Sequence, residues 1–175
     1  AVELVPFRAA VKAGVASIMT AHVMFPALDA SEPATLSPAI LDGLLRKKLG
    51  YQGVVASDDL EMAAVADRYG IEELVRLGLL AGVDLFLVCH DANKQAAAVE
   101  AAFRLVESGR VPQARVEEAL HRVHELKRRF VGAPAAPTLA EARALVRAAP
   151  HLELAAKLAA VRVDDARGAS PVDVG

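Results

Sequence analysis

The sequence predicts an α/β fold in which short parallel strands alternate with helices. Three nearly continuous apolar runs, 15–21, 53–57 and 83–89, are separated by stretches in which apolar residues recur with helical spacing. Strands that are apolar at consecutive positions are buried on both faces, which is typical of parallel sheets covered by helices. With 175 residues, of which 54% are hydrophobic, the chain is also long enough to bury a core.

The first predicted helix covers Val2–Ala13, with Pro6 near its first turn and Gly14 directly after its end. Proline is favoured at the start of a helix and glycine just past its end. The run 15–21 predicts the first strand, and the polar, proline-containing segment 27–36 predicts a loop.

A second helix is expected to begin at Ser37-Pro38, which supplies a cap and a first-turn proline, and to end at Gly50. The second strand, 53–57, follows it. The apolar stripe of this helix consists of Ile40, Leu41, Leu44 and Leu45.

The remaining elements complete the alternation. A helix over 71–82 precedes the third strand, 83–89, and Asp91 is expected to cap a helix over 92–107. A last long helix is predicted over 113–130. Its inner face is expected to consist of Val116, Leu120, Val123, Leu126 and Phe130.

Three strands are few for such a fold, because a closed (β/α)8 barrel of the TIM type needs eight strands and about 250 residues. We therefore interpret residues 1–131 as a partial TIM-type (β/α)8 barrel, comprising about its last three β/α units. Residues 132–175 start with a Pro/Ala-rich hinge and are assigned to a linker and a helical tail. Short helices are expected over 139–149 and 151–160, followed by a loop-like end.

Composition excludes several classes of function. The net charge is −2, and the densest basic run, Lys127-Arg128-Arg129, complements the end of its own helix, so no nucleic-acid partner is expected. No membrane span is predicted, because the most apolar stretch is interrupted by Arg76 and Asp84. Cys89 is the single cysteine; it excludes an internal disulfide and is typical of a reducing compartment. We expect a cytoplasmic location.

Adjacent carboxylates, Asp58 and Asp59, follow the second strand just before an expected helix. The carboxyl ends of parallel strands open onto the active site in α/β folds, so a carboxylate there is placed for chemistry. Either residue also suits the role of a helix cap, and the motif alone does not separate the two interpretations.

Six segments together resemble the catalytic domain of glycoside hydrolase family 3, in its β-N-acetylglucosaminidase (β-hexosaminidase) branch. They occur in the order of that family and cover about residues 1 to 130. The segments are 3–8 (ELVPFR), 18–23 (IMTAHV), 26–29 (PALD), 33–37 (PATLS), 53–62 (GVVASDDLEM) and 81–84 (AGVD).

The resemblance implies that Asp58 is the catalytic nucleophile of a retaining glycosidase, which forms a covalent glycosyl-enzyme that water then hydrolyses. Asp59 is then a helix cap or a supporting group. By analogy His22 is a substrate-binding candidate that donates a hydrogen bond to Asp58; the alternative is a structural histidine that holds its own loop. Met62 is either an apolar wall of the sugar pocket or a packed core residue. His90 and Asp91 are candidates for the rim of the site or for a cap-and-loop role.

A retaining reaction also needs a proton donor, which in this branch is a histidine on a loop of the form KHFPGHGD. No such segment occurs in these 175 residues. We therefore expect the chain to be the C-terminal portion of the catalytic barrel, to have the missing N-terminal half as a partner, and to be inactive alone. The implied substrate is a carbohydrate, an N-acetylglucosaminide of cell-wall or chitin type.

Three alternatives remain open: a phosphorylase that uses the same nucleophile, a non-catalytic interaction module or inactive fragment, and a sugar-binding regulator. No cofactor is expected, because the implied reaction needs none. No metal site is predicted either, since His22, His90 and Asp91 lack the spacing of a ligand set on one element.

Overall fold

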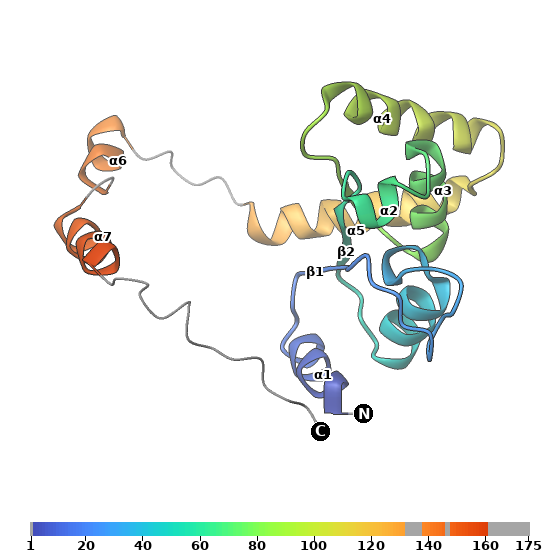
Figure 1. The fold of residues 1–175 in the computed structure, drawn as a ribbon, viewed down its shortest axis with the longest axis horizontal. Helices are drawn as coiled ribbons and strands as arrows, with labels where there is room; N and C mark the ends of the chain where they lie inside the picture. The colour runs from blue at the N-terminus through green and yellow to red at the C-terminus, as the bar shows by residue number, and fades with distance from the viewer. Residues whose placement is uncertain (1, 132–137, 146–147, 161–175) are drawn as a thin grey trace, which may run out of the picture. The chain divides into compact units, whose positions relative to one another are not determined.

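A computed structural model describes residues 2–131, 138–145 and 148–160 of this chain (Figure 1). The chain divides into two compact units, Ala1–Gly132 and Ala133–Gly175. The first unit is a mixed α/β structure with a small parallel sheet and contains all the predicted site residues. The second unit is helical in its described part.

The sheet of the first unit has three parallel strands in the order β1-β2-β3, so β2 lies in the centre. Met19 of β1 and Leu85 of β3 both pair with Ala56 of β2. The pairing of β2 with β3 is irregular between Ala56 and Asp59, where the register shifts. The parallel arrangement predicted from the apolar runs is confirmed. The strands are β1 (Ser17–Met19), β2 (Val54–Asp59) and β3 (Leu85–Leu87).

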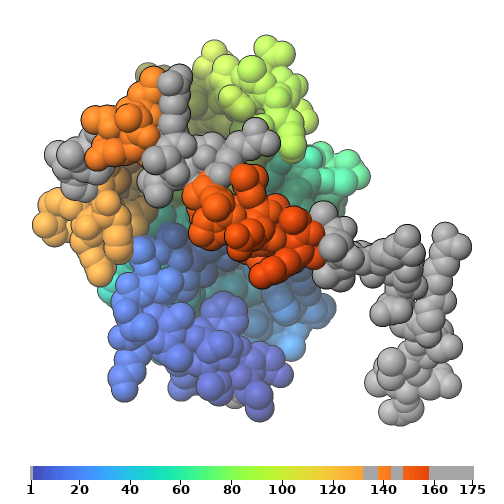
Figure 2. Space-filling view, turned by 90° about the vertical axis from the view of Figure 1, so that its left-hand side faces the viewer, coloured from blue at the N-terminus to red at the C-terminus, as the bar shows by residue number. Residues whose placement is uncertain are grey.

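Helices connect and flank these strands, and α1 and α4 lie at opposite ends of the first unit (Figures 1 and 2). The helices predicted over 92–107 and 113–130 are confirmed, and the Asp91 side chain caps α4 by accepting the N–H of Asn93 at 2.8 Å. Gly82 ends α3 in the left-handed conformation, at φ 119°. The helical segments are η1 (Val2–Leu4) and η2 (Ala34–Leu36), both 3-10 helices, η3 (Ala39–Lys48), a π-helix, and α1 (Val5–Lys12), α2 (Ala63–Ala66), α3 (Ile71–Ala81), α4 (Ala92–Glu107) and α5 (Gln113–Phe130).

Two apolar clusters form the core of the first unit. One joins α3, through Leu74 and Leu79, to Leu105 of α4. The other joins Leu41 and Leu45 of η3 to Val55 of β2 and to Val83, which precedes β3. Phe86 of β3 packs against both clusters, so β3 links the two halves of the core.

Two predicted helix faces differ from the structure. In η3, Leu41 and Leu45 are fully buried, whereas Ile40 and Leu44 are only partly buried. Ile40 also packs against the core cluster that contains Leu41 and Leu45, so the predicted stripe is confirmed in part. In α5, Leu120 and Phe130 are half-exposed, contrary to the prediction. Val116, Val123 and Leu126 are partly buried, in agreement with the prediction.

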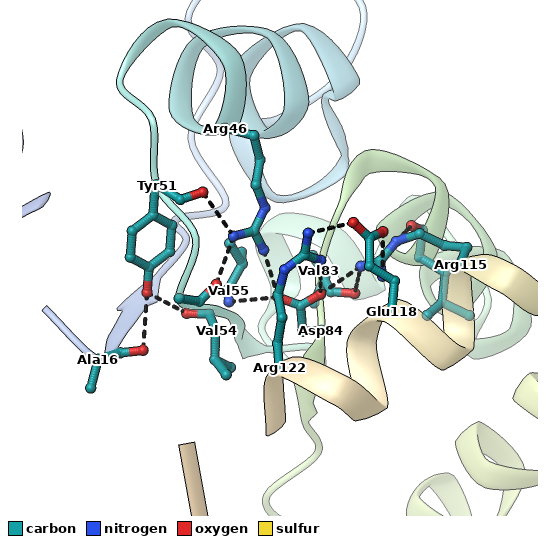
Figure 3. A network of polar contacts seen from close by, with 12 residues as sticks. Ala16, Arg46, Tyr51, Val54, Val55, Val83, Asp84, Arg115, Glu118 and Arg122 are labelled. Carbon is teal, nitrogen blue, oxygen red and sulfur yellow. Dashed lines mark hydrogen bonds and ion pairs between the residues drawn. The ribbon is translucent and has the colours of Figure 1, made fainter. Parts of the chain in front are cut away.

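Arg115 and Arg122 of α5 also point inward, because Asp84 lies beneath them. The side chain of Asp84 is 0% exposed, and its two oxygens contact Arg46 at 2.6 Å, Arg115 at 2.8 Å and Arg122 at 3.1 Å (Figure 3). Its Oδ2 also accepts the N–H of Val55 at 3.0 Å. Asp84 precedes β3, so this network fastens the amino ends of the strands to η3 and α5.

The same end of the sheet holds Tyr51, which is 2% exposed. Its hydroxyl lies 2.8 Å from the carbonyl oxygen of Val54 and 3.2 Å from that of Ala16, so it donates toward both (Figure 3). Burial raises the pKa of Tyr51 to about 12, because the phenolate would be desolvated.

In the second unit, α6 (Leu139–Leu145) is shorter than the helix predicted over 139–149, and α7 (Ala149–Ala160) begins two residues before the helix predicted over 151–160. Thr138 and Glu141 form a reciprocal cap at the start of α6. The predicted hinge, apart from Thr138, and the loop-like end lie outside the described residues. No helix in the described ranges has the length and apolar character needed to cross a membrane.

Candidate active site

Several polar side chains meet at the carboxyl ends of the three strands. Asp58 and Asp59 end β2, His22 follows β1, and Cys89 and His90 follow β3. Because the strands are parallel and adjacent, these residues share one edge of the sheet, as predicted. Strand β2 extends through both aspartates, two residues beyond the predicted end at Ser57, because its pairing with β3 continues to Asp59 and Leu87.

Asp58 is partly exposed and only lightly constrained. Its Oδ1 accepts the N–H of Asp59 at 2.8 Å. Within the described ranges, no hydrogen-bond or ion-pair partner contacts Oδ2. One oxygen is therefore oriented by the backbone while the other is available to a ligand.

The Asp59 carboxylate contacts the turn that follows its own strand and the segment that follows β3. Its Oδ1 accepts the N–H of Glu61 at 3.1 Å and of Cys89 at 3.3 Å, and its Oδ2 lies 3.3 Å from Nε2 of His90. The helix-cap interpretation of both aspartates is wrong, because the next helix, α2, begins only at Ala63 and has Met62 at its N-cap. Asp59 instead fixes a turn, which agrees with the supporting role that was its alternative.

His22 does not contact the Asp58 carboxylate, so the expected hydrogen bond between them is not formed. Its Nε2 lies 3.0 Å from the carbonyl oxygen of Asp59, and its Nδ1 lies 2.9 Å from Oγ1 of Thr35. A carbonyl oxygen only accepts, so Nε2 donates to Asp59, while Nδ1 contacts the Thr35 hydroxyl. The Thr35 hydroxyl in turn lies 2.8 Å from that of Thr20. This chain of contacts supports the alternative of a histidine that holds backbone in place.

Glu61 is a residue that the sequence interpretation missed. Its side chain is 7% exposed, and its carboxylate accepts the N–H of His90 at 2.5 Å and of Asp91 at 3.2 Å. These backbone hydrogen bonds, led by the one from His90, lower the pKa of Glu61. No sequence signal distinguishes such a residue from a solvated glutamate, because its main partners are backbone groups.

Three further residues line the same edge. Met62 is 44% exposed, so it is not the packed core methionine of the alternative interpretation. The His90 side chain is 79% exposed beside Asp59. Desolvation and the nearby Asp59 carboxylate raise the pKa of the Cys89 thiol, which makes Cys89 a poor nucleophile near neutral pH.

A cavity of about 350 Å³ lies at the other end of the sheet, where the strands begin. It is lined by residues before β1, by the start of β2 and by one side of α5, including Ala16, Gly53 and Arg122. None of the carboxyl-end residues lines it. Among the residues that the structure describes, no group of three or more His, Cys, Asp or Glu side chains is arranged to hold a metal ion.

Residues 1–126 match the model of the glycosyl hydrolase family 3 N terminal domain. The match covers more than half of the chain, and the chain therefore belongs to glycosyl hydrolase family 3. The resemblance inferred from the six sequence segments is confirmed.

Curated relatives agree with this assignment. A beta-hexosaminidase of Thiobacillus denitrificans is 51% identical over 88 residues, which are 50% of this chain and 24% of that protein. A beta-hexosaminidase of Nitrosomonas eutropha is 33% identical over 132 residues, which are 72% of this chain and 38% of that protein. The chain thus spans from 24% to 38% of the length of these two relatives.

Solved structures share the fold. A family 3 beta-N-acetylglucosaminidase from Paenibacillus sp. superposes with a TM-score of 0.75 at 48% identity, covering 78% of this chain and 26% of that one. The beta-N-acetylglucosaminidase from Thermotoga maritima gives a TM-score of 0.67 at 37% identity, covering 71% and 28%. The relatives are glycosidases, and the small parallel sheet with its helices is a part of their fold.

Proposed function

We propose that this chain carries the nucleophile of a retaining exo-β-N-acetylglucosaminidase, and that this nucleophile is Asp58. The observation that supports the proposal is the contrast in hydrogen bonding at the carboxyl edge of the sheet. Asp58 has one oxygen oriented by the N–H of Asp59 and one that is open, whereas Asp59 and Glu61 use both of their oxygens. Cys89, with its raised pKa, does not compete for the role.

The proposed reaction has two steps. An oxygen of Asp58 attacks C1 of the sugar, and the bond between C1 and the glycosidic oxygen breaks as that oxygen takes a proton from a general acid. Water then attacks C1, the bond from C1 to Asp58 breaks, and the proton lost by the water returns to the acid/base group. We infer that the acid/base residue lies outside these 175 residues, and that strands beyond them complete the barrel of which residues 1–131 form the predicted part.

A direct contact with the substrate is proposed for Met62, and a supporting role for His22. The exposed side chain of Met62 stands next to the carboxylates and offers an apolar wall for the sugar ring. His22 has both ring nitrogens bonded within the protein, so its contribution is indirect: it holds the carbonyl of Asp59 and thereby the backbone after Asp58. N-acetylglucosaminides of cell-wall or chitin type are the proposed substrates.

A fluorinated N-acetylglucosaminyl donor tests the proposal in the protein that carries this chain. Fluorine slows both steps by destabilising the oxocarbenium-like transition state, and a good leaving group allows the covalent intermediate to accumulate. We expect peptide mass spectrometry to locate the sugar on Asp58. Adding phosphate distinguishes hydrolysis from phosphorolysis, in which the intermediate would be released as a sugar 1-phosphate.

Two variants control this experiment. Asp58→Asn should take up no label, because the amide is not a competent nucleophile. Asp67→Asn alters an exposed carboxylate at the end of α2 and should be labelled like the unmodified protein. Label on any other residue, or persistent labelling of Asp58→Asn, would exclude Asp58 as the nucleophile.

A further inference from the structure

Two acidic side chains, Asp59 at the end of β2 and Glu61 just after it, hold the backbone that follows β3. The N–H groups of three consecutive residues, Cys89, His90 and Asp91, point at carboxylate oxygens of Asp59 and Glu61. Glu61 makes the shorter contacts, at 2.5 Å to His90 and 3.2 Å to Asp91, and Asp59 accepts from Cys89 at 3.3 Å. The turn between β3 and α4 is therefore fastened to the turn that follows Asp58.

Charge and burial make Glu61 the stronger part of this connection. Hydrogen bonds to an ionised acceptor are shorter and stronger than neutral ones. The Glu61 side chain is almost fully buried, its lowered pKa keeps it ionised, and Nζ of Lys94 lies 3.6 Å from its Oε1. The groups that face it are thus two backbone donors and one ammonium, and the Asp59 carboxylate is a nearby like charge that raises the pKa of Glu61.

The connection reaches Asp58 through short, continuous contacts. The N–H of Glu61 donates to Oδ1 of Asp59, and the N–H of Asp59 donates to Oδ1 of Asp58. The turn is also closed by Met62 N–H donating to the Asp59 carbonyl at 3.1 Å, and Leu60 N–H donates to the Leu87 carbonyl at 2.9 Å. Movement of Glu61 would loosen Asp59 and, through it, the oriented oxygen of Asp58.

We propose that Glu61 is a positioning residue for the nucleophile. It holds the turn between β3 and α4 against the turn after Asp58 and thereby orients the Asp58 carboxylate. This inference rests on the proposed function of Asp58. It is distinct from a catalytic role, because the buried Glu61 carboxylate is saturated by protein donors.

The test measures labelling of Asp58 by the fluorinated donor in the protein that carries this chain. Misplacement of a reacting group by about 1 Å costs up to about a hundredfold in rate. Glu61→Ala should therefore lower the first-order labelling rate constant by about ten- to a hundredfold, with little change in the donor concentration for half-maximal rate. Glu61→Gln should recover most of the rate, because its Oε1 can still accept from both His90 and Asp91.

Glu73→Gln is the matched control. It neutralises a partly buried glutamate on α3 that bonds Arg76 rather than the backbone at the strand ends, so the labelling rate should not change. If Glu61→Ala does not fold, Glu61→Asp gives the same comparison, because its shorter side chain cannot reach the His90 N–H without moving the turn.

Amide hydrogen exchange supplies a readout that does not depend on the reaction. The His90 and Asp91 amides should exchange faster in Glu61→Ala than in Glu61→Gln. If the unmodified protein is not labelled on Asp58, the proposed function fails and the positioning role falls with it. If it is labelled and Glu61→Ala reacts at the unmodified rate, or Glu61→Gln is as slow as Glu61→Ala, the positioning role alone is overturned.

Discussion

Two aspartates at opposite ends of the same sheet differ in almost every physical respect. Asp84, before β3, is inaccessible to solvent and contacts three guanidinium groups and one backbone N–H. Asp58, at the end of β2, is partly exposed and accepts a single backbone hydrogen bond. The residue type is the same, so the surroundings decide what each carboxylate can do.

Asp84 is suited to stabilising the fold, and Asp58 is suited to reacting with a substrate. A carboxylate with saturated oxygens cannot attack a substrate without first breaking strong contacts, whereas a lightly held one can. The buried network also has a cost. Burial of Arg46 disfavours its charged form and lowers the pKa of its guanidinium, and the Asp84 carboxylate opposes that shift. The carboxylate at the amino ends of the strands thus stabilises the fold, whereas Asp58 at the carboxyl ends keeps one oxygen available to a ligand.

The largest effect should come from Asp58→Asn. We expect kcat to fall by at least about a thousandfold, because the covalent step loses its nucleophile. The free energy of unfolding should change by less than about 1 kcal/mol, since Asp58 makes only one hydrogen bond. Steady-state kinetics and urea unfolding of the protein that carries this chain measure the two quantities. A large loss of stability with little loss of rate would show that Asp58 has a structural role and is not the nucleophile.

Asp84→Ala should have the opposite profile at the other end of the sheet. Removing one partner of a buried ionic network costs about 3–5 kcal/mol, because the remaining charges stay buried without compensation. Urea unfolding should show this loss. The exposed pair of Asp42 and Lys47 provides the control, and Asp42→Asn should cost less than about 1 kcal/mol. A cost for Asp84→Ala as small as that of the control would show that the network does not stabilise the fold.

A smaller, pH-dependent effect is expected from Tyr51. Its pKa rises from 10.0 to about 12 on folding, so the neutral phenol contributes stability that is fully present below pH 10 and is lost as the pH approaches 12. The shift corresponds to about 3 kcal/mol. Urea unfolding at several alkaline pH values should show a loss that is absent from Tyr51→Phe. Equal losses in both proteins would contradict the assignment.

Much of this fold follows from hydrophobic periodicity. The runs that predict β2 and β3 and the patterns that predict α4 and α5 depend on local sequence, and the structure confirms these elements. The strand ends do not follow in the same way, because the extension of β2 to Asp59 requires the partner strand. The inner face of α5 is predicted only in part for a related reason: Arg115 and Arg122 also point inward, because Asp84 is buried beneath them.

In the candidate site, too, local sequence predicts some features, whereas others depend on contacts with distant segments. The position of Asp58 at a strand end can be predicted from an apolar run followed by carboxylates. The partner of His22 cannot, because it is the Asp59 carbonyl, a backbone atom that is 37 residues distant in sequence. Glu61 escapes prediction for the same reason, since the backbone donors that bind it can belong to any residue type.

Chemical rescue of Asp58→Gly by azide tests the central claim most directly. Removing the carboxylate leaves space on the face of the sugar from which Asp58 is proposed to attack, and azide can occupy that space. We predict that azide restores turnover of an activated β-N-acetylglucosaminide and that the product is the α-glycosyl azide. A β-configured product, or undiminished hydrolysis by the variant without azide, would contradict the assignment of Asp58 as the nucleophile.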